Sequence, residues 1–248
     1  MRIYFIVLLI IIQNIDFKDQ QLKYSRVRNA YKEKEVSISN LLIEKKLERD
    51  SFQIYIQAFK HEKQLEVWAK NTNDKKFTKL ITYNICMLSG QLGPKRKMGD
   101  LQIPEGFYYI SKFNPFSNFH LSLEINYPNL SDKILGHKTK PGGDIFIHGN
   151  CVTIGCIPIT DDKIKEFYIF CIEAANNGQD KIPVHIYPAK LNNTNFTNLT
   201  TKYVNEDDKI NLWIDLKKSY DYFKTNKTLP KITFLNSGRH TIESTLIN

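Results

Sequence analysis

A strict alternation of apolar and polar residues in the stretch FHLSLEINY, residues 119–127, constrains the fold more than any other feature. One face of an extended chain would carry only apolar or aromatic side chains: Phe119, Leu121, Leu123, Ile125 and Tyr127. The other face would carry His120, Ser122, Glu124 and Asn126. A period of two is the mark of a half-buried β-strand, so this stretch predicts a strand at the surface of a core.

Other stretches extend this prediction to a mostly β, α+β fold with a mixed sheet. Similar strand patterns occur in LEVWAKN, ITYNICM, DIFIHG and PVHIY. A helix is expected from Asp161 to about Gly178, because Thr160 can cap it and apolar residues then recur at helical spacing. Charged residues 21–48 show weak helical periodicity, residues 191–203 are rich in Asn and Thr, and a further helix is expected near 206–224.

The N-terminus indicates export. Arg2 precedes ten apolar residues, 3–12, which is short for a membrane span and typical of the core of a secretory signal. No cleavage motif follows, so an uncleaved membrane anchor is the alternative. The net charge of +9 favours anionic partners, but no basic stripe interleaved with aromatics appears, which argues against nucleic acid.

Export would permit disulfides, yet the four cysteines do not resemble a disulfide framework. Cys151 and Cys156 share one short loop, and Cys171 falls on the apolar face of the expected helix. We therefore expect Cys171 in the core. Packing or lining of a pocket is the expected role of Cys151, with a disulfide or resolving role as the alternative.

The stretch HGNCVTIGC, residues 148–156, lies between an expected strand and an expected helix. A neighbouring imidazole can activate a thiol that is otherwise little ionised at neutral pH, so His148 and Cys156 suggest a base and a nucleophile. Gly149 and Gly155 would let the loop fold back and bring the two together. Three nitrogen and sulfur ligands in this stretch also allow a zinc site, although no clear fourth ligand is present.

Two motifs in the right order resemble the L,D-transpeptidase (YkuD-type) catalytic domain family. The first is IHGNCVTIGCIPI, and the second is the stretch of residues 89–110, in which IPEGF stands where the family has a Pro-x-Gly-aromatic pattern. The similarity covers about residues 52–190 and is greatest to the YafK-like branch of murein L,D-transpeptidases. It implies a catalytic domain over 52–190, after a signal or anchor (1–20) and a helical segment (21–51), and before a partly helical appendage (191–248).

The resemblance implies an exported, periplasmic cell-wall enzyme of a Gram-negative bacterium that acts on peptidoglycan stem peptides through a thioester at Cys156. His148 would be the base and the Gly149 carbonyl would orient its ring. Thr153 would hold the family's Ser/Thr position, and Gly155 with Cys156 would supply backbone donors for the oxyanion. The acyl group would pass to an amine, giving 3–3 cross-links or attaching a protein to the wall. One alternative is hydrolysis of the peptide by the same Cys156 and His148. Another is a zinc-binding or non-catalytic wall-binding module. For the enzyme, neither a cofactor nor a metal is expected.

Two departures from the family pattern affect substrate binding. Ile154 replaces a second histidine found in many relatives, and Pro158 replaces an Arg or Asn. Loss of the arginine removes a candidate bidentate partner for a substrate carboxylate, so other residues must bind the substrate. The candidate substrate contacts are Asn150, His120, Lys95 and Arg96. For His120 the simpler interpretation is an ordinary exposed histidine. For Lys95 and Arg96 it is a solvated hairpin tip over residues 95–97.

Overall fold

The computed structural model describes residues 16–244, so the predicted signal or anchor lies largely outside the described residues. Among the residues described, no helix is both long and apolar enough to span a bilayer. The helices are α1 (Phe17–Leu22), α2 (Ser25–Glu44), α3 (Leu130–Leu135), α4 (Asp161–Asn176), α5 (Asn193–Lys202) and α6 (Asp207–Asn226). The strands are β1 (Phe52–Phe59), β2 (Gln64–Asn71), β3 (Thr78–Asn84), β4 (Gly106–Asn114), β5 (Ser122–Ile125), β6 (Phe146–His148), β7 (Ile157–Pro158), β8 (Pro183–Tyr187), β9 (Lys231–Phe234) and β10 (His240–Glu243).

Eight of these strands form one mixed sheet in the order β3-β2-β1-β8-β4-β5-β6-β7, and β9 and β10 form a separate hairpin. Strand β1 pairs parallel with β8, and β6 pairs parallel with β7, while the other neighbours are antiparallel. The predicted α+β fold with a mixed sheet, a helix after Cys156 and helical segments at both ends is thus confirmed.

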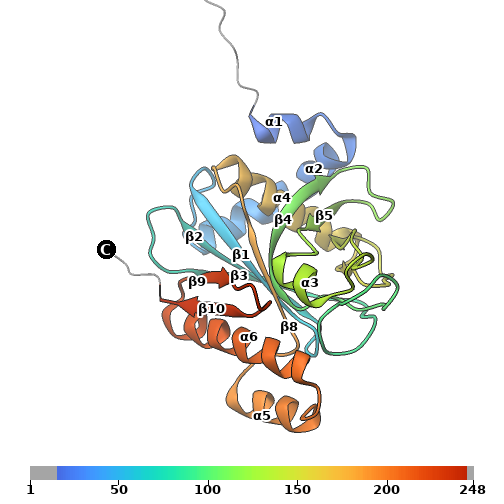
Figure 1. Ribbon diagram of the computed structural model, residues 1–248. Helices are drawn as coiled ribbons and strands as arrows, with labels where there is room; N and C mark the ends of the chain where they lie inside the picture. The colour runs from blue at the N-terminus through green and yellow to red at the C-terminus, as the bar shows by residue number, and fades with distance from the viewer. Residues whose placement is uncertain (1–15, 245–248) are drawn as a thin grey trace, which may run out of the picture.

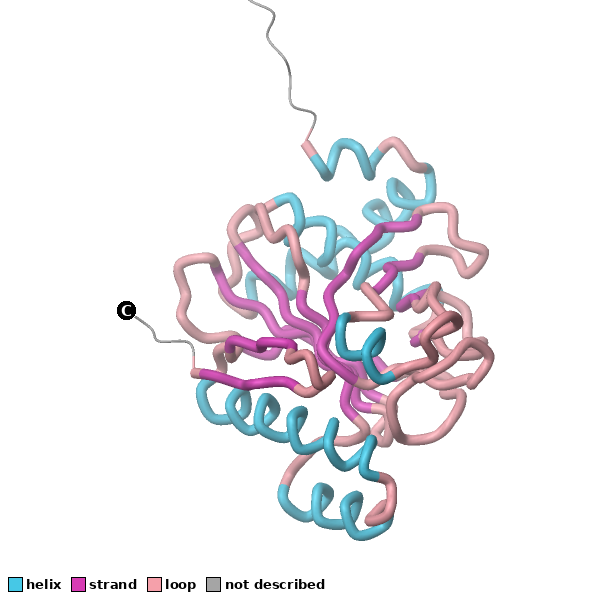
Figure 2. The backbone as a smooth tube through the Cα atoms, viewed as in Figure 1, coloured by secondary structure: helices cyan, strands magenta, loops and turns pink. Residues whose placement is uncertain are grey.

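Helices cover the centre of the sheet on both faces (Figure 1). Along β1, Ile54 and Ile56 join the main apolar core that includes α2 and α4, whereas Tyr55 and Phe59 pack on the opposite side with residues of α6. A strand buried on both faces is expected where helices lie on each side of a sheet. In Figure 2 the long loops gather beside β5–β7, at the edge where the sheet carries HGNCVTIGC.

Helix α4 matches its prediction closely. It starts at Asp161, with two aspartates in the first turn, where the helix dipole favours negative charge. Cys171 is completely buried within it, as expected. Thr160 occupies the N-cap position, but its side chain makes no capping hydrogen bond, and its φ of 72° turns the chain sharply from β7 into the helix.

Two regions differ from the prediction. The strand expected over 119–127 is shorter, Ser122–Ile125, because His120 has a φ of 69° that extended backbone cannot adopt. The Asn/Thr-rich segment forms helix α5, where the side chain of Asn192 accepts a hydrogen bond from the Asn195 amide and caps the first turn. The β9–β10 hairpin was also unanticipated.

A buried polar cluster joins α6 to the sheet. The Glu105 carboxylate accepts hydrogen bonds from the indole of Trp213 at 2.6 Å and from the amide of Gly93 at 2.7 Å, and it pairs with Lys60 at 2.8 Å. Both charged side chains are almost fully enclosed. The C-terminal helix is therefore fixed to the loop that precedes β4.

Candidate active site

The parallel pairing of β6 with β7 brings the two candidate catalytic residues onto one face of the sheet. Ile147 pairs with Ile157, and both point into the core. Side chains alternate along a strand, so His148 at the end of β6 and Cys156 just before β7 lie on the opposite face. Their offset of two residues across neighbouring strands places their Cα atoms roughly 8 Å apart.

His148 is held in one orientation. Its side chain is buried, its ring stacks on that of Phe119 with centroids 4.6 Å apart, and its Nδ1 hydrogen-bonds to the carbonyl of Gly149. A carbonyl can only accept, so Nδ1 carries the proton and Nε2 is left with a free lone pair. Among the described residues Nε2 has no hydrogen-bond partner, and burial lowers the pKa of the imidazole.

Cys156 is a free, partly buried thiol. Its Sγ lies 3.4 Å from the amide nitrogen of Phe146 and 3.6 Å from the carbonyl oxygen of Asp144. Burial raises the pKa of this thiol, and the Phe146 N–H opposes the rise in part. The thiol is therefore protonated at neutral pH and needs a base to become a nucleophile.

The hydroxyl of Thr153 shapes the turn before Cys156. It donates to the carbonyl of Cys156 at 2.7 Å and accepts from the amide of Gly155 at 3.0 Å. Gly155 has a φ of 142°, which favours glycine. The N–H of Gly155 already donates to the Thr153 hydroxyl. Gly155 is therefore not a free backbone donor, contrary to the expectation. Within the described part of the chain, the Cys156 amide is not engaged in this way.

A second set of contacts fixes the start of the loop. A Cβ at Gly149 would lie 2.5 Å from the carboxylate of Asp161 and 2.7 Å from the carbonyl of Phe119, so only glycine fits. Asp161 accepts a hydrogen bond from the Asn150 amide at 2.6 Å, which ties the loop to the first turn of α4. The side chain of Asn150 turns back onto the Cys151 amide. Sequence patterns had marked Asp161 only as a helix start, and had missed Phe119 as a partner of the imidazole.

The expected role of Cys151 as a packing residue is wrong, because it forms a disulfide with Cys86. The two Cα atoms are 5.8 Å apart although 65 positions separate them in the chain. The bond ties the HGNCVTIGC loop to the segment after β3. It also removes Cys151 from any zinc set with His148 and Cys156, and no group of three or more His, Cys, Asp or Glu residues in the range 16–244 is arranged to hold a metal ion.

The interpretation of residues 95–97 as a solvated tip is also wrong for its first two members. Lys95 is buried and pairs with Asp100 at 2.6 Å. Arg96 forms a two-pronged pair with Asp208 of α6 and lies 3.3 Å from Asp132 of α3. The Arg96 guanidinium therefore pairs with carboxylates of two helices, which is a structural role.

His120 is neither on a strand nor an ordinary exposed histidine. It lies in the turn before β5, its Nε2 is buried without a partner among the described residues, and burial lowers the pKa of its ring. The guanidinium of Arg26 from α2 donates to its carbonyl at 2.7 Å. This hydrogen bond links the turn at His120 to the N-terminal helical segment.

The chain is similar to a protein family, to a curated relative and to a solved structure. The L,D-transpeptidase catalytic domain YkuD matches residues 53–186. YafK of Escherichia coli (strain K12), a proposed L,D-transpeptidase, is 35% identical over 195 residues, which cover 78% of this chain and 75% of that protein. The crystal structure of the helical cell shape determining protein Pgp2 from Campylobacter jejuni is similar with a TM-score of 0.44 and 21% identity, over 75% of this chain and 74% of that one.

Proposed function

Since the chain belongs to the L,D-transpeptidase (YkuD) catalytic domain family, we propose that it is a cysteine acyltransferase that acts on peptidoglycan stem peptides. Cys156 is the nucleophile and His148 the general base. The observation that carries this assignment is the Nε2 of His148, which is buried and has no hydrogen-bond partner among the described residues while Nδ1 is tied to Gly149. The β6–β7 register supports it, because strand alternation places Cys156 on the same sheet face.

The first half-reaction forms a thioester. As Sγ of Cys156 attacks the carbonyl carbon of the scissile amide, Nε2 of His148 takes the thiol proton. The developing oxyanion needs a nearby donor, and the Cys156 amide, which Thr153 does not engage, is the backbone N–H nearest to the reacting sulfur in the chain. Collapse of the adduct breaks the C–N bond, and His148 returns the proton to the leaving amine.

The second half-reaction releases the acyl group. An acceptor amine attacks the thioester, its proton passes to His148, and the Cys156 thiolate is released and reprotonated. A stem-peptide amine as acceptor gives a 3–3 cross-link, an amine of a protein gives attachment to the wall, and water gives hydrolysis. The Cys86–Cys151 disulfide supports an oxidising compartment, in keeping with a periplasmic location.

Incubation with purified muropeptides, followed by mass analysis of the products, tests the proposal. Wild-type protein should give dimeric products if it is a transferase, or shortened peptides if it is a hydrolase. Cys156→Ala should give neither. Unchanged substrate with wild-type protein, or equal conversion by Cys156→Ala, would contradict a cysteine enzyme and favour a wall-binding module.

A further inference from the structure

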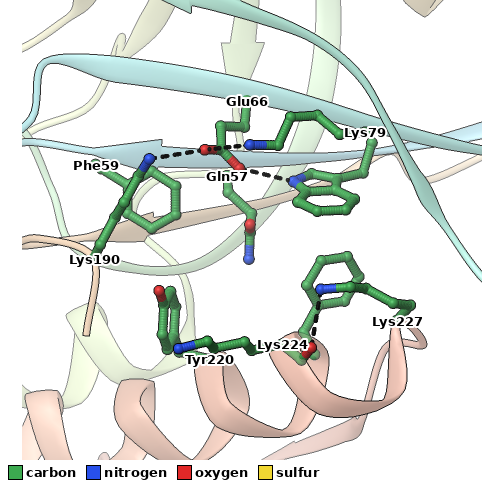
Figure 3. A pocket seen from close by; sticks show the side chains of 10 residues that line it. Gln57, Phe59, Glu66, Lys79, Lys190, Tyr220, Lys224 and Lys227 are labelled. Atoms are coloured by element: carbon green, nitrogen blue, oxygen red, sulfur yellow. Dashed lines mark hydrogen bonds and ion pairs between the residues drawn. The ribbon is translucent and has the colours of Figure 1, made fainter. Parts of the chain in front are cut away.

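A cavity lies on the face of the sheet opposite α4, away from HGNCVTIGC. It has a volume of about 180 Å³ and is lined by residues of β1, β2, β3 and α6, together with Lys190 after β8 and Lys227 at the end of α6. We call it the β2–α6 pocket (Figure 3). Gln57 points into its centre, and aromatic rings form much of its wall: Phe59, Trp68, Tyr220 and Phe223.

The charges of the β2–α6 pocket are strongly unbalanced. Four lysines line it, Lys79, Lys190, Lys224 and Lys227, against the single carboxylate of Glu66. The Oε1 atom of Glu66 already pairs with Lys79 at 3.0 Å and with Lys190 at 3.1 Å. Its Oε2 atom accepts from the indole of Trp68 at 3.1 Å. Both carboxylate oxygens of Glu66 are therefore already engaged by Lys79, Lys190 and Trp68.

The two lysines on the α6 side have no such partner. Within residues 16–244, neither Lys224 nor Lys227 forms an ion pair with a carboxylate. The Lys227 ammonium donates to the carbonyl of Lys224 at 2.9 Å and lies 5.0 Å from the centre of the Trp68 ring. Burial and repulsion from Lys79 and Lys224 lower the pKa of Lys227. A bound anion would relieve this repulsion.

We propose that the β2–α6 pocket binds a small polyanion, a molecule with two or more carboxylate or phosphate groups. The volume is several times what one water molecule needs, so a small polyanion has room in the pocket. Lys224 and Lys227 would bind its charged groups, and the rings of Trp68 and Tyr220 would contact its less polar face. The site shares no lining residue with the loop that holds Cys156.

Titration of the full chain with citrate and with pyrophosphate, at constant ionic strength, tests the site. Isothermal calorimetry measures affinity, and tryptophan fluorescence reports on the pocket, because Trp68 lines it while Trp213, the other tryptophan, is fully buried against Glu105. Saturable binding with a fluorescence change that Trp68→Phe removes is expected. Glucose, a neutral molecule of similar size, should give no signal.

The double variant Lys224→Gln/Lys227→Gln should bind at least tenfold more weakly. Lys133→Gln/Lys218→Gln removes the same charge from exposed positions outside the pocket and should stay within twofold of wild type. An equal loss in both double variants would show attraction to net charge alone and would overturn the proposal.

The polyanion could be free or could be an acidic group of a wall polymer. A soluble muropeptide, titrated into Cys156→Ala so that no turnover occurs, distinguishes these sources. Binding of citrate or pyrophosphate supports a free ligand. Muropeptide binding alone, weakened by the Lys224→Gln/Lys227→Gln change, supports the polymer. If none of the three probes binds saturably, the proposal fails, whatever the chemistry at Cys156.

Discussion

The Thr153 hydroxyl spans the turn before the candidate nucleophile, donating to the Cys156 carbonyl at 2.7 Å and accepting from the Gly155 amide at 3.0 Å. Loss of both hydrogen bonds should let the turn relax and move Sγ out of line with the base. We expect Thr153→Val to lower kcat/KM by at least about tenfold, equivalent to about 1.4 kcal/mol or more. Steady-state kinetics on muropeptides measures this.

Thr153→Ser is the matched control, because serine keeps the hydroxyl. It should retain activity within a few fold of wild type, and the melting temperatures of both variants should stay close to the parent value. Equal losses in the valine and serine variants would assign the effect to packing of the methyl group instead.

The pH dependence of kcat/KM should show that the resting enzyme holds Cys156 as a neutral thiol and His148 as a neutral imidazole. Burial lowers the pKa of His148 and raises that of Cys156. The base works only when unprotonated, and a lowered pKa keeps it unprotonated to more acidic pH. The acid limb of kcat/KM should therefore fall below the ordinary histidine value of 6.5. His148→Ala should lower turnover by about two to four orders of magnitude and remove this limb.

Thiolate absorbance at 240 nm gives an independent reading of the same pair. The difference between wild type and Cys156→Ala should appear only above the ordinary thiol value of 9.0. A thiolate signal at neutral pH would instead indicate a preformed thiolate–imidazolium ion pair.

A carbapenem should acylate Cys156 and no other residue. A β-lactam carbonyl is a strained amide, so it can trap the thioester stage of the proposed reaction. The other cysteines are shielded, since Cys171 is fully buried and Cys86 is bonded to Cys151. Intact-mass measurement should show one adduct on wild type and none on Cys156→Ala. Absence of an adduct on folded wild-type protein would count against an acylating nucleophile.

The Cys86–Cys151 disulfide should stabilise the chain and the catalytic loop. The bond closes a loop of 65 positions and so lowers the entropy of the unfolded chain. In the chain-entropy model this raises the free energy of unfolding by about 4 kcal/mol, which corresponds to a shift on the order of 10 °C in melting temperature. We expect dithiothreitol to lower the melting temperature of wild type by such an amount. Cys86→Ser/Cys151→Ser should melt lower and be insensitive to the reductant. If wild type is equally insensitive, the bond contributes nothing to stability.

Local patterns in the sequence predicted the elements whose residues are adjacent in the chain. The alternation around Leu123 and the acidic first turn at Asp161 both correspond to observed elements, because strand and helix periodicity depend on near neighbours. The pairing of Cys86 with Cys151 depends on how β3 and the HGNCVTIGC loop meet in space, which periodicity does not encode. The residue types in HGNCVTIGC suggested His148 and Cys156 as a base and a nucleophile, and the family resemblance then assigned them these roles.

The basic residues before β4 show the same limit. The sequence alone predicted a solvated hairpin tip at Lys95 and Arg96, because their acidic partners are not all nearby in the sequence. Asp208 lies on α6, more than a hundred positions away, and only the packing of that helix brings it to Arg96. The direction of a charged side chain is thus decided by tertiary partners.

Glu105 links α6 to the loop before β4. Its carboxylate binds the Trp213 indole at 2.6 Å and the Lys60 ammonium at 2.8 Å. Removing one partner of a buried ion pair leaves an uncompensated charge, so Glu105→Ala should lower the free energy of unfolding by about 3–5 kcal/mol. Glu105→Gln, which keeps an acceptor for the indole, should lose less. Urea denaturation followed by tryptophan fluorescence measures both, and a loss under about 1 kcal/mol for Glu105→Ala would show that the cluster does not hold α6 in place.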